Sequence, residues 1–356
     1  MQLEEIVDAA KEPTTPRFPS SKGLLPLSEE FTKPTMMHNL SAMPQIKDDH
    51  DADALRSGRR GRTFESCRPD FEELCVGHPL VLRGLPNDQY HSLPVPSKSP
   101  LWAYRKHGPV WYYEQFVARS HPPFASDSLA RGTLVHLVFE LGEPEFRRRA
   151  VLVPERFCTA SGTLSAGKES KAWLADQPKD AILLTPADDA VITGLWKQAQ
   201  DNAAVREIID SISEHELSVI WEREDGHRLR CRFDAVTHDG RLIDWKTTRE
   251  ARPLESWIGP AIDHGYHYQA ALYGGGAIEA GISDRPMTFV VLSTTPSYQV
   301  QAVTLPANVV DMCHDMITRD LDEIALRTET DNWLCDGYGE VHELVVPDYL
   351  LRRHHA

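Results

Sequence analysis

The sequence lacks several features that would assign it to common classes of protein. Its 356 residues contain no run of about eighteen apolar residues, which argues against a membrane-spanning helix. The N-terminus has no basic segment followed by an apolar one, so we expect no signal peptide and a cytoplasmic location. The six cysteines include no Cys-x-x-Cys pair, which argues against a zinc site, an iron–sulfur cluster and a disulfide framework.

Positive charge is also scarce. Lys and Arg number 38 against 53 Asp and Glu, and the formal net charge is −15. Affinity for DNA comes largely from cations that replace counterions on phosphates, so a nucleic-acid ligand would need a local basic track. The hydrophobic content of 41% is that of a globular protein, long enough for one large domain or two smaller ones.

The composition changes near residue 86. Before it, prolines recur and apolar residues show no sustained period, which predicts a weakly ordered or disordered extension over 1–85. The basic segment at 56–62 has two interpretations, a nucleic-acid contact or a solvated linker, and we favour the linker. We expect a folded domain over 86–330, with its core at about 128–326, and a tail over 331–356.

Apolar periodicity predicts the elements of this domain. One predicted helix begins near Ser97, and further predicted helices cover 128–141, 187–212, about 262–280 and about 308–326. Predicted strands cover 217–221, 229–236, 242–245, 287–293 and 298–304. This order predicts an α/β fold in which helices flank a central mixed sheet, with helical additions on the N-terminal side.

Two of the predicted strands carry the most informative residues. A His-Asp-Gly turn at 238–240 joins them into a hairpin, which brings Asp234 and Asp244 close together. Neighbouring carboxylates repel each other, and a hard divalent cation such as Mg²⁺ relieves the repulsion by taking oxygen ligands from both. Lys246 faces the same side as Asp244, because strand side chains alternate. The triad suits phosphodiester hydrolysis; the alternative is an ordinary surface hairpin with solvated charges.

Five segments carry a resemblance to a known family: Arg131-Gly-Thr-Leu-Val-His136, Glu216-Leu-Ser-Val-Ile-Trp221, Arg230-Cys-Arg-Phe-Asp234, Ile243-Asp-Trp-Lys-Thr-Thr248 and Tyr266-His-Tyr-Gln-Ala-Ala-Leu-Tyr273. Together they resemble the PD-(D/E)XK nuclease superfamily, and within it the RecE-type (exodeoxyribonuclease VIII-like) exonucleases of phages and bacteria. The similarity covers roughly residues 90–326. Phe233 stands where family members usually have proline, which supplies shape and no ligand.

The resemblance implies a restriction-endonuclease-like core with assigned roles for the motif residues. Asp234, Asp244 and Lys246 are the implied catalytic residues. His136 and Glu216 are implied to join the two aspartates as ligands of one or two Mg²⁺ or Mn²⁺ ions. Each has a structural alternative, because a lone helical histidine is often a hydrogen-bonded core residue and Glu216 could equally face solvent at a strand edge.

Other motif residues are candidates for contacts with DNA. Gln269 and Tyr273 are four residues apart, so they share a helix face that can reach the scissile phosphate. Thr247 and Thr248 can donate hydrogen bonds to a phosphate, although threonines are also common in strands for structural reasons. Arg232, two residues before Asp234, is a further candidate.

The resemblance also implies an activity and partners. It implies a processive 5′-to-3′ exonuclease on the ends of linear double-stranded DNA, acting in recombination beside a single-strand annealing protein and compatible with a homo-oligomeric ring, with no membrane partner. A Cas4-like or RecB-like nuclease of other polarity and an endonuclease stay open. So does a non-catalytic DNA-binding or assembly protein on the same fold, although such proteins typically lose a carboxylate or the lysine that this sequence retains.

Overall fold

The structure is a computed structural model that describes residues 78–121, 127–160, 162–249, 253–341 and 343. All of these residues belong to one compact unit. Most of the predicted extension over 1–85, including the basic segment at 56–62, lies outside the described residues, as does most of the tail over 331–356. Within the described ranges, no helix is long and apolar enough to cross a membrane.

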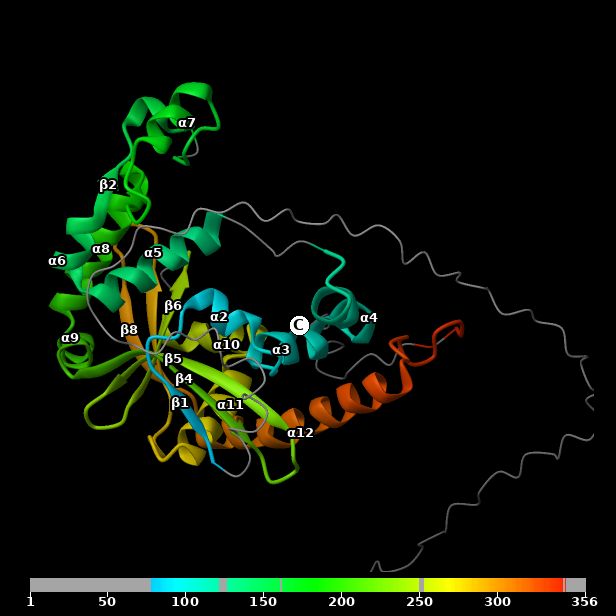
Figure 1. Ribbon diagram of the computed structural model, residues 1–356. Helices are drawn as coiled ribbons and strands as arrows, with labels where there is room; N and C mark the ends of the chain where they lie inside the picture. Colours follow the sequence, from blue (N-terminus) through cyan, green and yellow to red (C-terminus); the bar gives the residue numbers. More distant parts are fainter. Residues whose placement is uncertain (1–77, 122–126, 161, 250–252, 342, 344–356) are drawn as a thin grey trace, which may run out of the picture. The chain divides into compact units, whose positions relative to one another are not determined.

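A six-stranded mixed sheet organises this unit (Figure 1). Its strand order is β1-β4-β5-β6-β7-β8, in which β6 and β7 run parallel and the other neighbours run antiparallel. The strands are β1 (Leu80–Leu82), β4 (Ile212–Glu222), β5 (Arg228–Thr237), β6 (Leu242–Thr248), β7 (Thr288–Ser293) and β8 (Val300–Thr304). Two short strands, β2 (Ala150–Leu152) and β3 (Ile182–Leu184), form a separate parallel pair.

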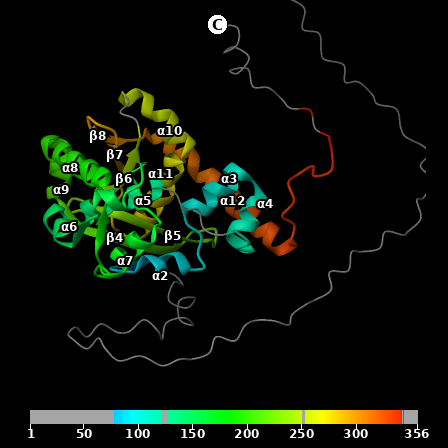
Figure 2. The same ribbon diagram turned by 90° about the horizontal axis from the view of Figure 1, so that it is seen from above.

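Helices cover both faces of the sheet, and Figure 2 shows them from above. One hydrophobic cluster joins the sheet to α3 (Lys98–His107), α10 (Ile258–Asp263), α11 (Tyr266–Glu279) and α12 (Ala307–Thr330). A second cluster joins the other face to α5 (Asp127–Leu141), α6 (Glu143–Arg149), α8 (Pro186–Asp201) and α9 (Ala203–Asp210). The other helices of the described residues are α2 (Asn87–Ser92), α4 (Pro109–Tyr112), α7 (Lys168–Ala175), the π-helix Tyr113–Val117 and the 3₁₀ turns Glu155–Phe157 and Leu254–Trp257.

The predicted α/β class, a central mixed sheet flanked by helices, is confirmed, but one predicted helix is wrong in its extent. The segment 187–212 contains two helices, because Asn202 ends α8 and its side-chain oxygen accepts hydrogen bonds from the first N–H groups of α9. Thr185 caps the start of α8 in the same way, with Pro186 at the first position. β4 then begins at Ile212, earlier than predicted.

β1 lies at the edge of the sheet in a segment for which the sequence predicted no strand. It has only three residues, too few to show a period-two pattern. It pairs with β4 from Leu80 opposite Ile220 to Leu82 opposite Ser218. The sheet therefore includes residues that precede the expected start of the folded domain at 86.

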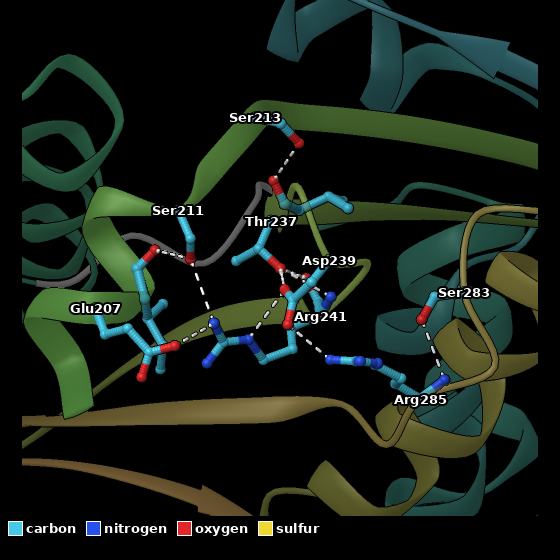
Figure 3. A network of polar contacts seen from close by, with 10 residues as sticks. Glu207, Ser211, Ser213, Thr237, Asp239, Arg241, Ser283 and Arg285 are labelled. Atoms are coloured by element: carbon cyan, nitrogen blue, oxygen red, sulfur yellow. Dashed lines mark hydrogen bonds and ion pairs between the residues drawn. The ribbon is translucent and has the colours of Figure 1, made fainter.

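The turn between β5 and β6 is held by charged side chains (Figure 3). Gly240 adopts a φ of +82°, which glycine allows at little cost. Arg241 contacts Asp239 at 3.2 Å and Glu207 of α9 at 2.9 Å, and Arg285 donates to Asp239 at 2.7 Å. The predicted hairpin is thus anchored at its turn, and the candidate aspartates lie toward its other end.

Candidate active site

The strands β5 and β6 separate at the two aspartates. They pair through 235–236 and 242–243, in a register that would place Asp234 opposite Asp244 one step further along. The two strands form no backbone pair at that step. Instead, the side-chain Oδ2 of Asp234 accepts a hydrogen bond from the backbone N–H of Trp245 at 2.8 Å. The two carboxylates therefore lie where β5 and β6 are no longer paired through their backbones.

β5 is irregular at the same position. Phe233 packs in the cluster that contains α11, whereas Ala235 packs in the cluster on the opposite face. Residues two apart on a regular strand face the same side, so the strand changes face at Asp234. On β4, Glu216 lies at the same level and has a φ of +49°, in the left-handed region. Glu216, Asp234 and Asp244 consequently form a row across three neighbouring strands.

His136 approaches this row from α5. Its Nδ1 lies 3.4 Å from Oδ2 of Asp234, and the two side chains are 34% and 15% exposed. The structure thus brings together a histidine and an aspartate that lie nearly a hundred residues apart in the sequence. The imidazole is accessible enough to meet a ligand and is not a buried core residue.

Asp244 is held from two sides. Lys246 forms an ion pair with its Oδ2, and Gln269 of α11 donates a side-chain N–H to its Oδ1. Asp244 is 3% exposed and Gln269 is 4% exposed. The Lys246 ammonium also lies 4.8 Å from the centre of the Tyr266 ring, a cation–π distance. Gln269 therefore orients a carboxylate in this structure, and its contact with DNA stays a prediction.

The protonation of the row reflects crowding of negative charge. Burial and the neighbouring Asp244 raise the pKa of Asp234 to about 6. Burial and the neighbouring Asp234 raise the pKa of Glu216 to about 7, although Arg232 opposes the shift. Burial alone would lower the pKa of Lys246, but Asp244 and Asp234 outweigh it and raise that pKa above its ordinary value. The lysine stays charged while the carboxylates still repel each other.

Arg232 is part of the scaffold beside the row. It is 8% exposed and donates to Oε2 of Glu216 at 3.4 Å, to Oγ of Ser218 at 2.8 Å and to the carbonyl of Leu85 at 2.9 Å. Its guanidinium also lies 4.0 Å from the centre of the Tyr90 ring. These contacts tie the segment after β1 to the sheet, so a contact between Arg232 and DNA stays a prediction that the burial does not favour.

The other proposed DNA contacts lie on α11 and at the end of β6. Tyr273 places the edge of its ring against Phe233, with ring centroids 5.8 Å apart, and is partly buried. Thr247 and Thr248 are half-buried at the strand end, where the carbonyl of Thr248 accepts a hydrogen bond from the N–H of Thr294 at 2.8 Å. Their contacts with DNA also stay predictions.

One further residue of the site was missed by the sequence analysis. Lys98, the first residue of α3, donates to the carbonyl of His264 at 2.7 Å and lies 5.7 Å from the centre of the Tyr266 ring, the same ring that Lys246 approaches. Nothing in the sequence near Lys98 marks it, because it lies outside every motif. Only the packing of α3 beside α10 and α11 brings it here.

The donor atoms fit a hard divalent cation. Asp244 Oδ2 is buried and forms an ion pair with the Lys246 ammonium. A divalent cation prefers carboxylate oxygens and would relieve the repulsion between Asp234 and Asp244. Over the described part of the chain, however, no three His, Cys, Asp or Glu side chains lie close enough together to form a metal cluster. The fit rests on the chemistry of the two aspartates, with His136 and Glu216 as their neighbours.

Comparisons with known proteins agree with the geometry. The fold is similar to the crystal structure of a predicted exonuclease from Eubacterium rectale, with a TM-score of 0.50 and 14% identity over 75% of this chain and 97% of that one. At such low identity the likeness concerns the fold alone. A search among curated proteins gives no match. The sequence model of the PD-(D/E)XK nuclease superfamily matches residues 103–325, which is more than half of the chain and contains His136, the aspartate hairpin and α11. The chain belongs to the PD-(D/E)XK nuclease superfamily.

Proposed function

We propose that this protein is a metal-dependent deoxyribonuclease that degrades linear double-stranded DNA from its ends in the 5′-to-3′ direction. The observation that carries the proposal is the arrangement at the separating strands, where Asp234 meets His136 and Asp244 meets Lys246. Membership of a nuclease superfamily supports hydrolysis of a nucleic acid. The polarity and a role in recombination beside a single-strand annealing protein rest on the RecE-type resemblance of the motifs.

The residues have distinct tasks in this proposal. Asp234 and Asp244 would hold one or two Mg²⁺ or Mn²⁺ ions, with His136 and Glu216 as further ligands. A bound ion of this kind supplies Lewis acidity toward the phosphate and lowers the pKa of a coordinated water. The Lys246 ammonium offsets negative charge that develops on the phosphoryl oxygens, and it is positioned for this by its ion pair with Asp244.

Two hydrogen-bond donors of the protein orient the carboxylates. Gln269 fixes the rotation of the Asp244 carboxylate by donating to one of its oxygens, so that the other oxygen keeps its direction. The backbone N–H of Trp245 does the same for Asp234. Both donors belong to the folded scaffold, so the carboxylates are oriented before a ligand arrives.

The alternatives are a nuclease of other polarity, an endonuclease and a non-catalytic DNA-binding or assembly protein. The retention of Asp234, Asp244 and Lys246 in contact with supporting residues disfavours the last. The buried, ion-paired Asp244 would be a costly feature to keep in a protein that only binds DNA.

The test is digestion of duplex DNA with Mg²⁺ and with a chelator. We expect the wild type to degrade linear duplex only with Mg²⁺, and the isosteric variant Asp244→Asn and the variant Lys246→Met to leave it intact while keeping their circular dichroism spectra. Substrates blocked at the 5′ or the 3′ end determine the polarity, and a covalently closed circle detects an endonuclease. Digestion by Asp244→Asn at the wild-type rate would refute the catalytic assignment.

A further inference from the structure

Two lysines from distant parts of the chain meet at one aromatic ring. Lys98 lies 5.7 Å and Lys246 lies 4.8 Å from the centre of the Tyr266 ring. Lys246 has a carboxylate partner in Asp244. Among the described residues, Lys98 forms no ion pair with a carboxylate and donates to the backbone carbonyl of His264 at 2.7 Å. Its positive charge is therefore not neutralised in the way that the charge of Lys246 is.

A third lysine extends the group. Lys106, also on α3, donates to the carbonyl of Asp263 at 3.4 Å, next to the carbonyl that Lys98 contacts. All three lysines act on the imidazole of His264. Partial burial lowers its pKa, Lys106, Lys98 and Lys246 lower it further, and Asp263 opposes the shift. A chain with a net charge of −15 thus gathers three lysines around His264, one of which forms the ion pair with the candidate catalytic Asp244. This is the kind of local basic track that a DNA ligand requires.

The positive charge of Lys98 is not fully offset by the carboxylates near it. Burial and the neighbouring Lys246 lower the pKa of Lys98 to about 7, with only partial compensation by Asp244. An anion placed against Lys98 would favour its charged form. The folded protein therefore favours an anion beside Lys98.

A purely structural role explains part of this arrangement. Lysine side chains often donate to the last carbonyls of a helix, and Lys98 and Lys106 do so at the end of α10. Capping alone does not require that the ammonium of Lys98 lie beside that of Lys246. The repulsion between these two ammonium groups disfavours the charged form of Lys98. An anion bound by both would remove that cost.

We propose that Lys98, with Lys106 beside it, binds a DNA backbone phosphate adjacent to the scissile phosphate at Lys246. The inference rests on the proposed function and extends it, because it assigns a phosphate subsite to a helix that precedes all of the motifs. Lysine suits this task as a point charge on a flexible stem. In this role Lys98 is a positioning residue that holds the strand while Lys246 acts at the reacting phosphate.

The test compares Lys98→Met, which keeps the length of the apolar stem, with Lys98→Arg, which keeps the charge. Lys197→Met is the matched control, because Lys197 is an exposed lysine of α8 on the opposite face of the sheet. The dissociation constant of a labelled duplex is measured by fluorescence anisotropy with a chelator present, over a range of salt concentrations. KM and kcat are measured with Mg²⁺, and thermal unfolding is followed for each variant.

We expect Lys98→Met to raise the dissociation constant and KM about tenfold, as for the loss of one charge-assisted contact, with kcat changed less than about threefold. The slope of the logarithm of affinity against the logarithm of salt should fall by about 0.9, the value for one lost phosphate contact. Lys98→Arg should restore most of the affinity, and Lys197→Met should match the wild type.

Two results would overturn the inference. One is a Lys98→Met variant with the affinity and salt slope of Lys197→Met. The other is a loss of binding that Lys98→Arg does not restore and that accompanies a lower unfolding temperature, which would assign Lys98 to capping alone. If the wild type itself neither binds nor cuts duplex DNA, the proposed function fails, and this subsite fails with it.

Discussion

Gln269 of α11 donates its side-chain N–H to Oδ1 of Asp244 on β6, a residue 25 positions earlier in the chain. The contact connects a helix on one face of the sheet to the carboxylate that the sequence marks most clearly as catalytic. It also gives the side-chain nitrogen of Gln269 a partner within the protein, while the predicted contact of Gln269 with DNA stays a prediction.

This relationship predicts the effect of Gln269→Leu, which keeps the size of the side chain and removes the donor. We expect kcat for duplex digestion to fall about 10- to 100-fold, the usual cost of losing a group that orients a metal ligand. The circular dichroism spectrum should not change. Gln198→Leu on α8 is the control and should retain wild-type activity. A Gln269→Leu enzyme with wild-type kcat would show that Asp244 does not depend on this contact.

The raised pKa of Asp234 predicts a pH-dependent stability. Its pKa is about 6 in the folded protein against an ordinary value of 3.8, so between about pH 4 and pH 6 the folded state holds a proton that the unfolded state has released. The free energy of unfolding therefore falls as the pH rises through this window, and the loss is complete above it. In metal-free buffer at pH 8, Asp234→Asn should be more stable than the wild type by on the order of 1–3 kcal/mol, with little difference at pH 4.

Urea denaturation at both pH values, with a chelator present, measures this difference. Adding Mg²⁺ at pH 8 should stabilise the wild type more than Asp234→Asn, because the substitution removes one of the two carboxylates that would hold the ion. Equal stability of the two proteins at pH 8 would contradict the repulsion between Asp234 and Asp244 that supports the metal site.

The glycines of α11 predict opposite effects of the same substitution at neighbouring positions. A Cβ atom at Gly276 would lie 2.7 Å from the Trp221 ring and 3.1 Å from Sγ of Cys231, whereas a Cβ at Gly275 would meet no atom within 4 Å. We expect Gly276→Ala to destabilise the protein by about 1–3 kcal/mol through overpacking. Gly275→Ala should stabilise it by about 0.5–1 kcal/mol through helix propensity. Thermal unfolding of the two variants tests the close packing of α11 against the sheet at Gly276. Equal unfolding midpoints of the two variants would contradict this packing.

Asp320 predicts how α3 is held in place. Its carboxylate accepts a hydrogen bond from the Tyr268 hydroxyl at 3.0 Å and two from Arg105, at 2.9 and 2.7 Å, which joins α12 to α11 and α3. We expect Asp320→Ala to lower the free energy of unfolding by about 3 kcal/mol, because it leaves a partly buried cation and a buried hydroxyl without their partner. The exposed Asp315 on the same helix is the control, and Asp315→Ala should change stability by less than about 0.5 kcal/mol. Denaturant titration of both variants provides the comparison, which fails if they coincide.

Much of the fold could be predicted from local patterns. Alternation of apolar residues located β4 to β8, and the Gly240 turn joined β5 to β6. The register of that hairpin then brought Asp234 and Asp244 to the same level, because a short turn leaves little freedom in pairing. The motif residues, read together, indicated the superfamily that the family comparison shows.

Other features were decided by packing between distant segments. The change of face at Asp234, the burial of Arg232 beside α2 and the segment before it, and the contact of Gln269 with Asp244 follow from how the helices pack on the sheet. None has a local signature, because periodicity reports which residues are buried and not which of them meet. Lys98 is the clearest case, since its sequence neighbours describe only the start of a helix.

By itself, then, the sequence determined the class of fold, the hairpin and the identity of its acidic pair, because these depend on side-chain alternation and turn geometry over a few residues. The tertiary structure alone decided which side chains orient those acids and which cations gather beside them. The physical reason is that such contacts form only after the two layers of helices have closed on the sheet, and their free energies depend on burial that no local segment can provide.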